Sequence, residues 1–257
     1  MLKIAILSEN SLIDAYTQRV LQPVSTDPRF KIVGIVVHPR PRKSFKQKIK
    51  AFKRRLKGGA FLVMIIGKFI TKMSKTTYNT PDERKSFASV FSGQLFPELR
   101  FTMLNEAACE QLRQLDADLM ILAGYHQIVS SEVINLLPRG VLSYHYGDMR
   151  KYRGQPPVFR ELLNGESSIG ITLQQITAGI DRGAPVEEMS LSIAEGETLA
   201  SLEQRILSAS EMMMYKALCR YLDPAYAPAN LSAYGPVYTF PGLITWLRFH
   251  LKYSLFK

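Results

Sequence analysis

The stretch Lys3-Ile-Ala-Ile-Leu-Ser8 is a short, nearly continuous apolar run close to the N-terminus. A second run of the same kind follows at Lys31-Ile-Val-Gly-Ile-Val-Val-His38, and a helical pattern from about Ser11 to Leu21 lies between them. Apolar runs of this length are typical of strands that are buried on both faces of a sheet. Because a helix separates the two runs, the sequence predicts a parallel sheet with crossover helices.

Strands and helices continue to alternate farther along the chain. We expect strands over 117–124, 140–145, 170–176 and 186–193, and helices over 105–115, 130–138, 156–164 and 198–222. Asn105 is a favoured N-cap residue for the first of these helices. The expected fold class is therefore α/β, with an open, mostly parallel, Rossmann-like sheet and helices on both faces.

Two segments do not fit this alternation. The segment over about 39–80 is far longer than an ordinary connection between a strand and a helix, and we interpret it as a basic insertion. The segment over 223–257 is rich in aromatic and basic residues. We therefore divide the chain into one domain over 1–222, which contains the insertion, and a C-terminal extension over 223–257.

The positive charge of the chain is concentrated in the insertion. The formal net charge is +11, but residues 28–81 hold 15 Lys or Arg and no Asp or Glu, so the rest of the chain carries −4. Apolar side chains recur at helical spacing within the ten Lys and Arg of 40–57, at Phe45, Ile49, Phe52 and Leu56. This pattern favours contact of 40–75 with an anionic membrane surface or a phosphate-bearing substrate. A solvated insertion packed on the core remains an alternative, and RNA binding is a less favoured one.

The amino-acid composition excludes several classes of protein. A chain of 257 residues with 46% hydrophobic residues can bury a large core and is not wholly disordered. Its two cysteines exclude a disulfide scaffold and supply no metal-ligand spacing, so no metal is expected. The N-terminal apolar run is too short for the core of a signal peptide, and we therefore expect a cytoplasmic protein, with membrane contact only at its surface.

His145 stands out among the four histidines of the chain. It lies at the end of a predicted strand, and ligands of open α/β sheets bind at the carboxyl ends of the strands. The loop that follows, Gly147 to Pro157, is dense in charged residues, glycine and proline. This pattern is compatible with a functional histidine and also with a hydrogen-bonded structural one.

Several short motifs occur in an order that resembles one known family. They are Gly140-Val-Leu-Ser-Tyr-His145, Lys151-Tyr-Arg-Gly154, Asn164-Gly-Glu166, Gly170-Ile-Thr172 and Gly179-Ile-Asp-Arg-Gly183. Together they resemble the catalytic core of the folate-dependent formyltransferases, which include methionyl-tRNA formyltransferase, glycinamide ribonucleotide transformylase and the nucleotide-sugar N-formyltransferases. Asp181 follows His145 by 36 positions, as in that family, and the resemblance is strongest from about 116 to 183.

The resemblance implies a function and a set of site residues. It implies 10-formyltetrahydrofolate as the formyl donor, an amine as the acceptor, and a catalytic role for His145 and Asp181. The residues that would line the folate site are Tyr125, Gln127, Ile128, Val129, Thr177, Ala178 and Gly179. The residues that would contact the acceptor are Lys151, Tyr152, Arg153 and Gly154.

The chemistry of formyl transfer suits these residue types. An amine that attacks the formyl carbon produces a tetrahedral oxyanion, which needs a hydrogen-bond donor, and the amine must lose a proton. A histidine can donate to the oxyanion, and a neighbouring carboxylate can orient the histidine and take or relay the proton. His145 and Asp181 can divide the work in this way.

One position departs from the family pattern. Ser143 stands where the family has an asparagine, and a hydroxyl is shorter than an amide and has a single donor. Three interpretations follow: an active enzyme in which Ser143 replaces the amide, an enzyme with altered one-carbon chemistry, and a non-catalytic folate- or nucleotide-binding protein. The retention of His145 and Asp181 favours the first.

The acceptor is predicted by elimination. The loop after the first strand, Ser8 to Leu12, has no glycine for a phosphate cradle, which disfavours a glycinamide ribonucleotide. About 35 residues follow the expected 198–222 helix, too few for the C-terminal domain of the methionyl-tRNA enzymes. We therefore expect an amino sugar on a nucleotide or lipid carrier, and we expect no nucleic-acid partner. The pattern does not predict an oligomeric state.

Overall fold

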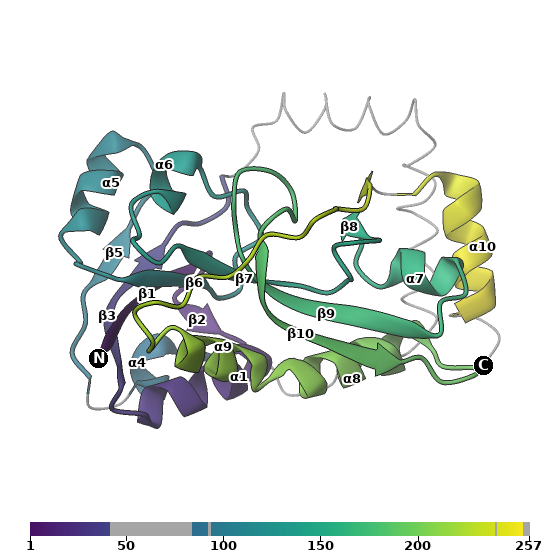
Figure 1. The fold of residues 1–257 in the computed structure, drawn as a ribbon, viewed down its shortest axis with the longest axis horizontal. Coiled ribbons are helices and arrows are strands. Elements are labelled where there is room, and N and C mark those ends of the chain that lie inside the picture. The colour runs from purple at the N-terminus through teal and green to yellow at the C-terminus, as the bar shows by residue number, and fades with distance from the viewer. Residues whose placement is uncertain (42–83, 92–93, 240, 254–257) are drawn as a thin grey trace.

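The computed structural model describes residues 1–41, 84–91, 94–239 and 241–253 (Figure 1). Most of the expected insertion, with its predicted amphipathic helix, lies outside these residues. The centre of the fold is a seven-stranded sheet in the order β10-β9-β7-β6-β1-β3-β5. Its strands are β1 (Leu2–Ser8), β3 (Phe30–Val37), β5 (Glu98–Arg100), β6 (Leu119–Leu122), β7 (Val141–His145), β9 (Ser168–Gln175) and β10 (Ala184–Ser192).

The sheet is mostly parallel. β1 pairs in parallel with β3 and β6, and the parallel part extends to β5 on one side and to β7 on the other. β9 then runs antiparallel to β7, and β10 antiparallel to β9. The expected open, mostly parallel α/β fold is therefore confirmed.

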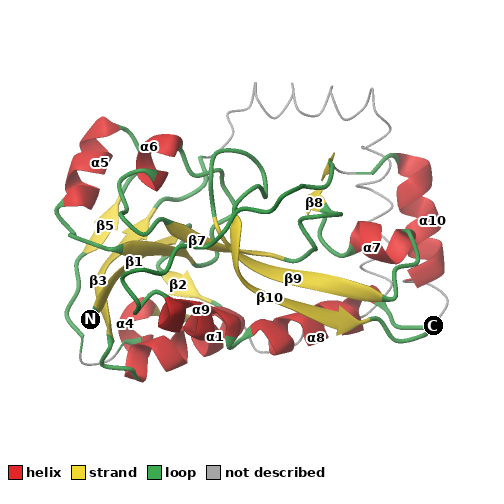
Figure 2. Cartoon of the chain, viewed as in Figure 1, coloured by secondary structure: helices red, strands yellow, loops and turns green. Residues whose placement is uncertain are grey.

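Both faces of the central strands are buried. Ile4 and Ile6 belong to one hydrophobic cluster, whereas Ala5 and Leu7 belong to another. Successive side chains of a strand point to opposite faces, so a continuous apolar run fills two cores at once. Helices cover the two faces (Figure 2): α1 (Ala15–Thr26), α8 (Leu199–Ser210) and α9 (Met213–Arg220) on one side, α5 (Glu106–Arg113) and α6 (Ser131–Ile134) on the other.

Two helix starts show how capping decides an element's boundary. Asn105 caps α5 as expected, accepting a hydrogen bond from the backbone N–H of Ala108 over 3.1 Å. The helix expected from Ser11 begins later, because Asp14 is its N-cap and accepts from the N–H of Thr17 over 2.7 Å. The two residues before the cap form β2 (Leu12–Ile13), which pairs with β4 (Lys85–Ser86) ahead of α4 (Phe87–Val90).

The single helix expected over 198–222 is wrong, because α8 ends at Ser210 and α9 begins at Met213. The Tyr144 hydroxyl donates to the Ser210 carbonyl over 2.9 Å and accepts from the Met214 N–H over 3.1 Å. In a continuous helix that carbonyl and that N–H would bond to each other. A side chain inserted into the helical ladder is a recognised cause of a break, and here it comes from β7.

The C-terminal extension packs on the rest of the fold. β11 (Val237–Tyr238) pairs in parallel with β8 (Arg153–Gly154), which lies in the loop after His145. Phe249 of α10 (Leu243–Tyr253) is fully buried, and its ring lies 4.2 Å from that of Phe159 at the start of α7 (Phe159–Leu163). These residues of the extension therefore pack on the core.

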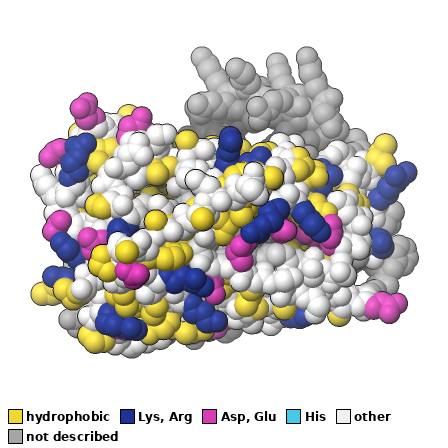
Figure 3. Space-filling model, viewed as in Figure 1, with side chains coloured by type: hydrophobic (Ala, Val, Ile, Leu, Met, Phe, Trp, Pro, Cys, Tyr) yellow, Lys and Arg dark blue, Asp and Glu magenta, His cyan; other side chains and the backbone are white. Residues whose placement is uncertain are grey.

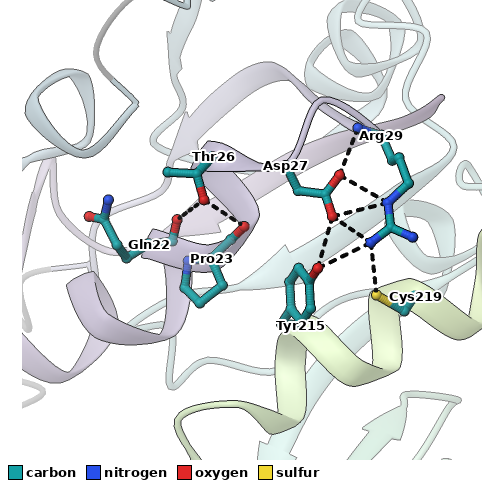
Figure 4. Close-up of polar contacts among 7 residues, drawn as sticks. All are labelled: Gln22, Pro23, Thr26, Asp27, Arg29, Tyr215 and Cys219. Carbon is teal, nitrogen blue, oxygen red and sulfur yellow. Dashed lines mark hydrogen bonds and ion pairs between the residues drawn. The ribbon is translucent and has the colours of Figure 1, made fainter.

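A polar cluster joins the start of β3 to α9 (Figure 4). The Asp27 carboxylate accepts from the guanidinium of Arg29 and from the hydroxyl of Tyr215, and Arg29 also contacts the sulfur of Cys219. These hydrogen bonds, led by those from Arg29, hold the pKa of Asp27 well below its usual range. The cluster fixes the end of α1 against the helix that covers the sheet.

The described residues are close to electrically neutral, with 20 Lys or Arg and 20 Asp or Glu. Figure 3 shows basic and acidic side chains interspersed over the face in view. The excess positive charge of the chain is thus carried by residues outside the described ranges. Among the helices of the described residues, none has the length and apolar composition required to cross a bilayer.

Candidate active site

His145 ends β7 and borders a cavity of about 580 Å³. This volume falls within the roughly 300–1,000 Å³ of most small-molecule sites. Ser143 and Asp181 line the same cavity. The three residues predicted from the motifs to act in catalysis therefore lie together at the carboxyl end of a central strand.

Both ring nitrogens of His145 face an oxygen atom. Nε2 lies 2.8 Å from the backbone oxygen of Tyr152, and Nδ1 lies 3.4 Å from Oδ2 of Asp181. A carbonyl oxygen only accepts hydrogen bonds, so Nε2 must carry a proton. Nδ1 is then the nitrogen that lies beside the Asp181 carboxylate.

Asp181 is held by hydrogen bonds from two other segments. Oδ2 accepts from the backbone N–H of Gly154 over 2.8 Å, and Oδ1 accepts from the side-chain amide of Gln174 over 3.3 Å. The Gln174 oxygen accepts in turn from the Gly183 N–H over 2.9 Å. The backbone of Asp181 has a φ of +43°, a left-handed conformation that aspartate tolerates better than most residues. These bonds aim its carboxylate at the imidazole.

Gly154 is required where β8 meets β11. Its φ is +90°, and a Cβ at this position would lie 2.2 Å from the backbone oxygen of Tyr238. The absence of a side chain lets the C-terminal strand approach and leaves the Gly154 N–H free to reach Asp181. The extension therefore supports the geometry of the site.

The cavity also collects most of the residues proposed for the folate donor. They are Tyr125, Gln127, Ile128, Val129, Thr177 and Gly179; Ala178 lines a separate hollow instead. The Tyr125 hydroxyl bonds to the ring of His38 over 2.8 Å, and burial raises the pKa of Tyr125 to about 12. The side chain of Ile128 is 84% exposed and offers an apolar surface at the cavity. Their role in binding folate stays a prediction.

The four residues proposed for the acceptor do not share one location. Gly154 lines the cavity, whereas the Arg153 guanidinium donates to the backbone oxygens of Gly235 and Ile180. Lys151 and the Tyr152 hydroxyl both bond to Glu166 and line a second cavity of about 330 Å³. An acceptor contact with Lys151 would have to be made from that second cavity, and the assignment stays a prediction.

Several residues that line the cavity belong to none of the sequence motifs. Tyr16 and Met214, from the helices α1 and α9, border the cavity together with Tyr144 and Tyr146 beside His145. The two tyrosines next to His145 could have been noticed from their position in the strand. Tyr16 and Met214 could not, because only the packing of the helices brings them to β7.

Comparison with known proteins identifies the family. Residues 46–218 match the family model described as formyl transferase. The chain belongs to this family. The methionyl-tRNA formyltransferase of Paraburkholderia phymatum is 36% identical over 112 residues, which cover 44% of this chain and 34% of that protein. The one from Burkholderia orbicola is 32% identical over 123 residues, 48% of this chain and 37% of that protein. The match thus spans about a third of the length of these curated relatives.

Solved structures of other formyl transferases share the fold. Glycinamide ribonucleotide transformylase 1 from Symbiobacterium toebii superposes with a TM-score of 0.57 at 17% identity, covering 89% of this chain and 91% of that one. An N-formyltransferase from Helicobacter canadensis, in complex with folinic acid and dTDP-3-aminofucose, superposes with a TM-score of 0.57 at 14% identity, covering 93% and 71%. At these identities the likeness supports the fold alone. In the described part of the chain, no group of His, Cys, Asp and Glu is arranged to hold a metal ion.

Proposed function

We propose that this formyl transferase moves a formyl group from 10-formyltetrahydrofolate to a primary amine. The observation that carries the proposal is the His145–Asp181 pair, 3.4 Å apart, in a cavity that also collects six of the residues expected to bind the donor. The matched family supports the same reaction class.

The geometry supports a division of labour in the reaction. The amine nitrogen attacks the formyl carbon, and protonated His145, held by its Nε2 bond to Tyr152, donates a hydrogen bond from Nδ1 to the oxyanion. The new C–N bond forms, and the bond to N10 of the folate breaks. Asp181 relays the proton that the amine loses toward N10, which leaves as an amine.

Ser143 is proposed as a further donor to the same oxygen. It lies two residues before His145 on β7 and lines the cavity, and its hydroxyl is 3.4 Å from the backbone oxygen of Tyr144, a long and weak contact. The hydroxyl is therefore available to a ligand. Together with the retention of His145 and Asp181 in the same cavity, this is compatible with the proposed active enzyme.

An amino sugar is the acceptor we propose. Tyr16, Tyr144 and Tyr146 form one wall of the cavity, and their hydroxyls bond to Ser210 and to one another. Aromatic side chains that line a cavity suit the apolar face of a sugar ring. A second candidate is an aminoacyl-tRNA, because the curated relatives are methionyl-tRNA formyltransferases.

We also propose a cytoplasmic location with contact between 40–75 and an anionic membrane surface. Its support is the sequence pattern alone, because most of this segment lies outside the described residues. Co-sedimentation of the full chain with anionic liposomes, against a chain lacking 40–75, tests it. Equal pelleting of the two would refute the contact.

The proposed reaction is tested by the release of tetrahydrofolate from 10-formyltetrahydrofolate. The purified chain would be given nucleotide-linked amino sugars and, in parallel, methionyl-tRNA. We expect turnover with an amino sugar, and none in His145→Asn, which replaces the charged imidazole by a shorter neutral amide but should still bind folate. A wild-type chain that binds folate and turns over no acceptor would point to the non-catalytic alternative.

A further inference from the structure

A second carboxyl group lies close to His145, on a different side from Asp181. Glu161 belongs to the short helix α7, and only 3% of it is exposed. It borders the 330 Å³ cavity and also a space of about 10 Å³ that His145, Tyr152 and Gly154 share. A space of that size has room for about one water molecule.

Gly147 has no side chain, and this leaves space near both Glu161 and the imidazole of His145. A Cβ on Gly147 would lie 2.7 Å from Nε2 of His145 and 3.2 Å from Oε1 of Glu161. The two side-chain atoms thus border the same small region. Oε1 of Glu161 is buried and has no hydrogen-bond partner among the described residues. A buried carboxyl oxygen without a partner is costly, and the small region that it borders is also bordered by Nε2 of His145.

Burial and neighbouring charges raise the pKa of the Glu161 carboxyl group. Burial, followed by the charges of Glu166 and Asp148, raises the pKa of Glu161 to about 7, although its own backbone N–H opposes the shift. Three nearby cations are engaged elsewhere: Lys151 with Glu166, Arg150 with Glu188 and Asp148, and Arg153 with backbone oxygens. The guanidinium of Arg160 lies over the ring of Tyr238, and its buried Nε has no hydrogen-bond partner among the described residues. Asp181 faces the imidazole from the opposite nitrogen.

We propose that Glu161 is a positioning residue for His145, whose own ionisation controls whether the imidazole carries a positive charge. When Glu161 is ionised, its negative charge favours the imidazolium; when it is protonated, that influence disappears. The two groups then titrate as a coupled pair. Because the imidazolium is the form that donates to the oxyanion, the importance for catalysis rests on the proposed function.

The test follows the imidazole signals of His145 by NMR as the pH is varied, in the full chain. His145→Asn identifies the signal among the four histidines. In the wild type we expect the His145 signals to change in two steps, one when Glu161 ionises and one when the imidazole loses its own proton. In Glu161→Gln, which keeps the shape of the protonated acid, we expect a single step and loss of the ring charge at a pH lower by about one unit.

Glu203→Gln is the matched control. Burial also raises the pKa of Glu203, but this residue on α8 lines neither the cavity of His145 nor the cavity of Glu161. It should leave the His145 titration unchanged. If Glu161→Gln folds poorly, the NMR titration of His145 can be repeated in Glu161→Met, which fills the same space without a carboxyl group.

The outcomes separate this inference from the reaction itself. Identical His145 titrations in the wild type and in Glu161→Gln or Glu161→Met would overturn the inference, whether or not the enzyme is active. A chain that lacks formyl transfer but shows the two-step titration would refute the proposed function and leave the coupling in place. In an active enzyme, Glu161→Gln should also move the pH profile of kcat in the same direction as the titration.

Discussion

Single residues at the site are constrained through more than one of their atoms. His145 uses both ring nitrogens, and Asp181 uses both carboxylate oxygens. Such double anchoring limits the orientations of the imidazole and the carboxylate, so that neither has to reorganise when charge develops in a reaction. Ser143 is the exception, because its hydroxyl makes only the weak contact with Tyr144.

The loose hydroxyl of Ser143 leads to a prediction about rate. If it donates to the formyl oxygen, Ser143→Ala should lower kcat by about 10²-fold, the usual order for one lost oxyanion donor. Folate binding, followed by fluorescence titration, should change little, because the other residues proposed to bind the folate lie elsewhere in the cavity. An unchanged kcat would show that the hydroxyl plays no part.

The raised pKa of Glu161 predicts that the stability of the fold depends on pH. Its pKa is about 7 in the folded chain, against 4.5 as the ordinary value, so the folded state binds more protons than the unfolded state between these two pH values. Stability therefore falls as pH rises through this window, by at most about 3 kcal/mol. Chemical denaturation of the wild type and of Glu161→Gln at pH 4 and pH 8 checks this. The variant should gain stability relative to the wild type at the higher pH; a constant difference would contradict the prediction.

At the scale of elements, the Tyr144 hydroxyl inserted between α8 and α9 connects these helices to the strand that carries the site. Tyr144 neighbours His145 on β7, and its hydroxyl occupies the gap between Ser210 and Met214. Burial raises the pKa of Tyr144 far above its usual value, in keeping with a hydroxyl that stays protonated and donates. The helix break and the strand that carries His145 are therefore one structural unit.

Tyr144→Phe tests this connection. It leaves a carbonyl and an N–H without partners at a buried position, and we expect a loss of about 1–3 kcal/mol in the free energy of unfolding, measured by urea denaturation. Tyr238→Phe is the control, because among the described residues its hydroxyl makes no hydrogen bond. Equal stability of the two variants would mean that α8 and α9 separate for another reason.

At the scale of the whole molecule, the C-terminal extension completes the domain. β11 pairs with β8 beside Asp181, and Phe249 of α10 is buried against Phe159 of α7. The helix that carries Glu161 therefore packs between the site and the extension. A substitution that weakens the packing of α10 should therefore lower the stability of the whole domain.

Phe249→Ala should destabilise the chain by about 3–5 kcal/mol, because it removes a fully buried aromatic ring. Ile244→Ala, on the same helix but 68% exposed, should have little effect. Thermal unfolding followed by circular dichroism compares the two. A transition for Phe249→Ala that matches the wild type would show that α10 is not part of the cooperative unit.

The site was only partly predictable from the chain. The order of motifs brought Ser143, His145 and Asp181 into one hypothesis, and the cavity contains all three. The motif that contains Lys151 and Tyr152 was harder to interpret, because these two residues line the second cavity, whereas Gly154 of the same motif lines the cavity of His145. Glu161 and Tyr16 carried no motif at all.

The sequence by itself determined the class of fold and the family. A continuous apolar run indicates a strand that is buried on both faces. The order of short motifs along the chain indicates the family. Both patterns can be recognised in the amino-acid sequence without knowing which segments are in contact. The tertiary structure decided the helix break at Tyr144, the pairing of β11 with β8, and the place of Glu161 beside His145. These depend on contacts between segments far apart in the chain, and no local pattern encodes which segments will meet.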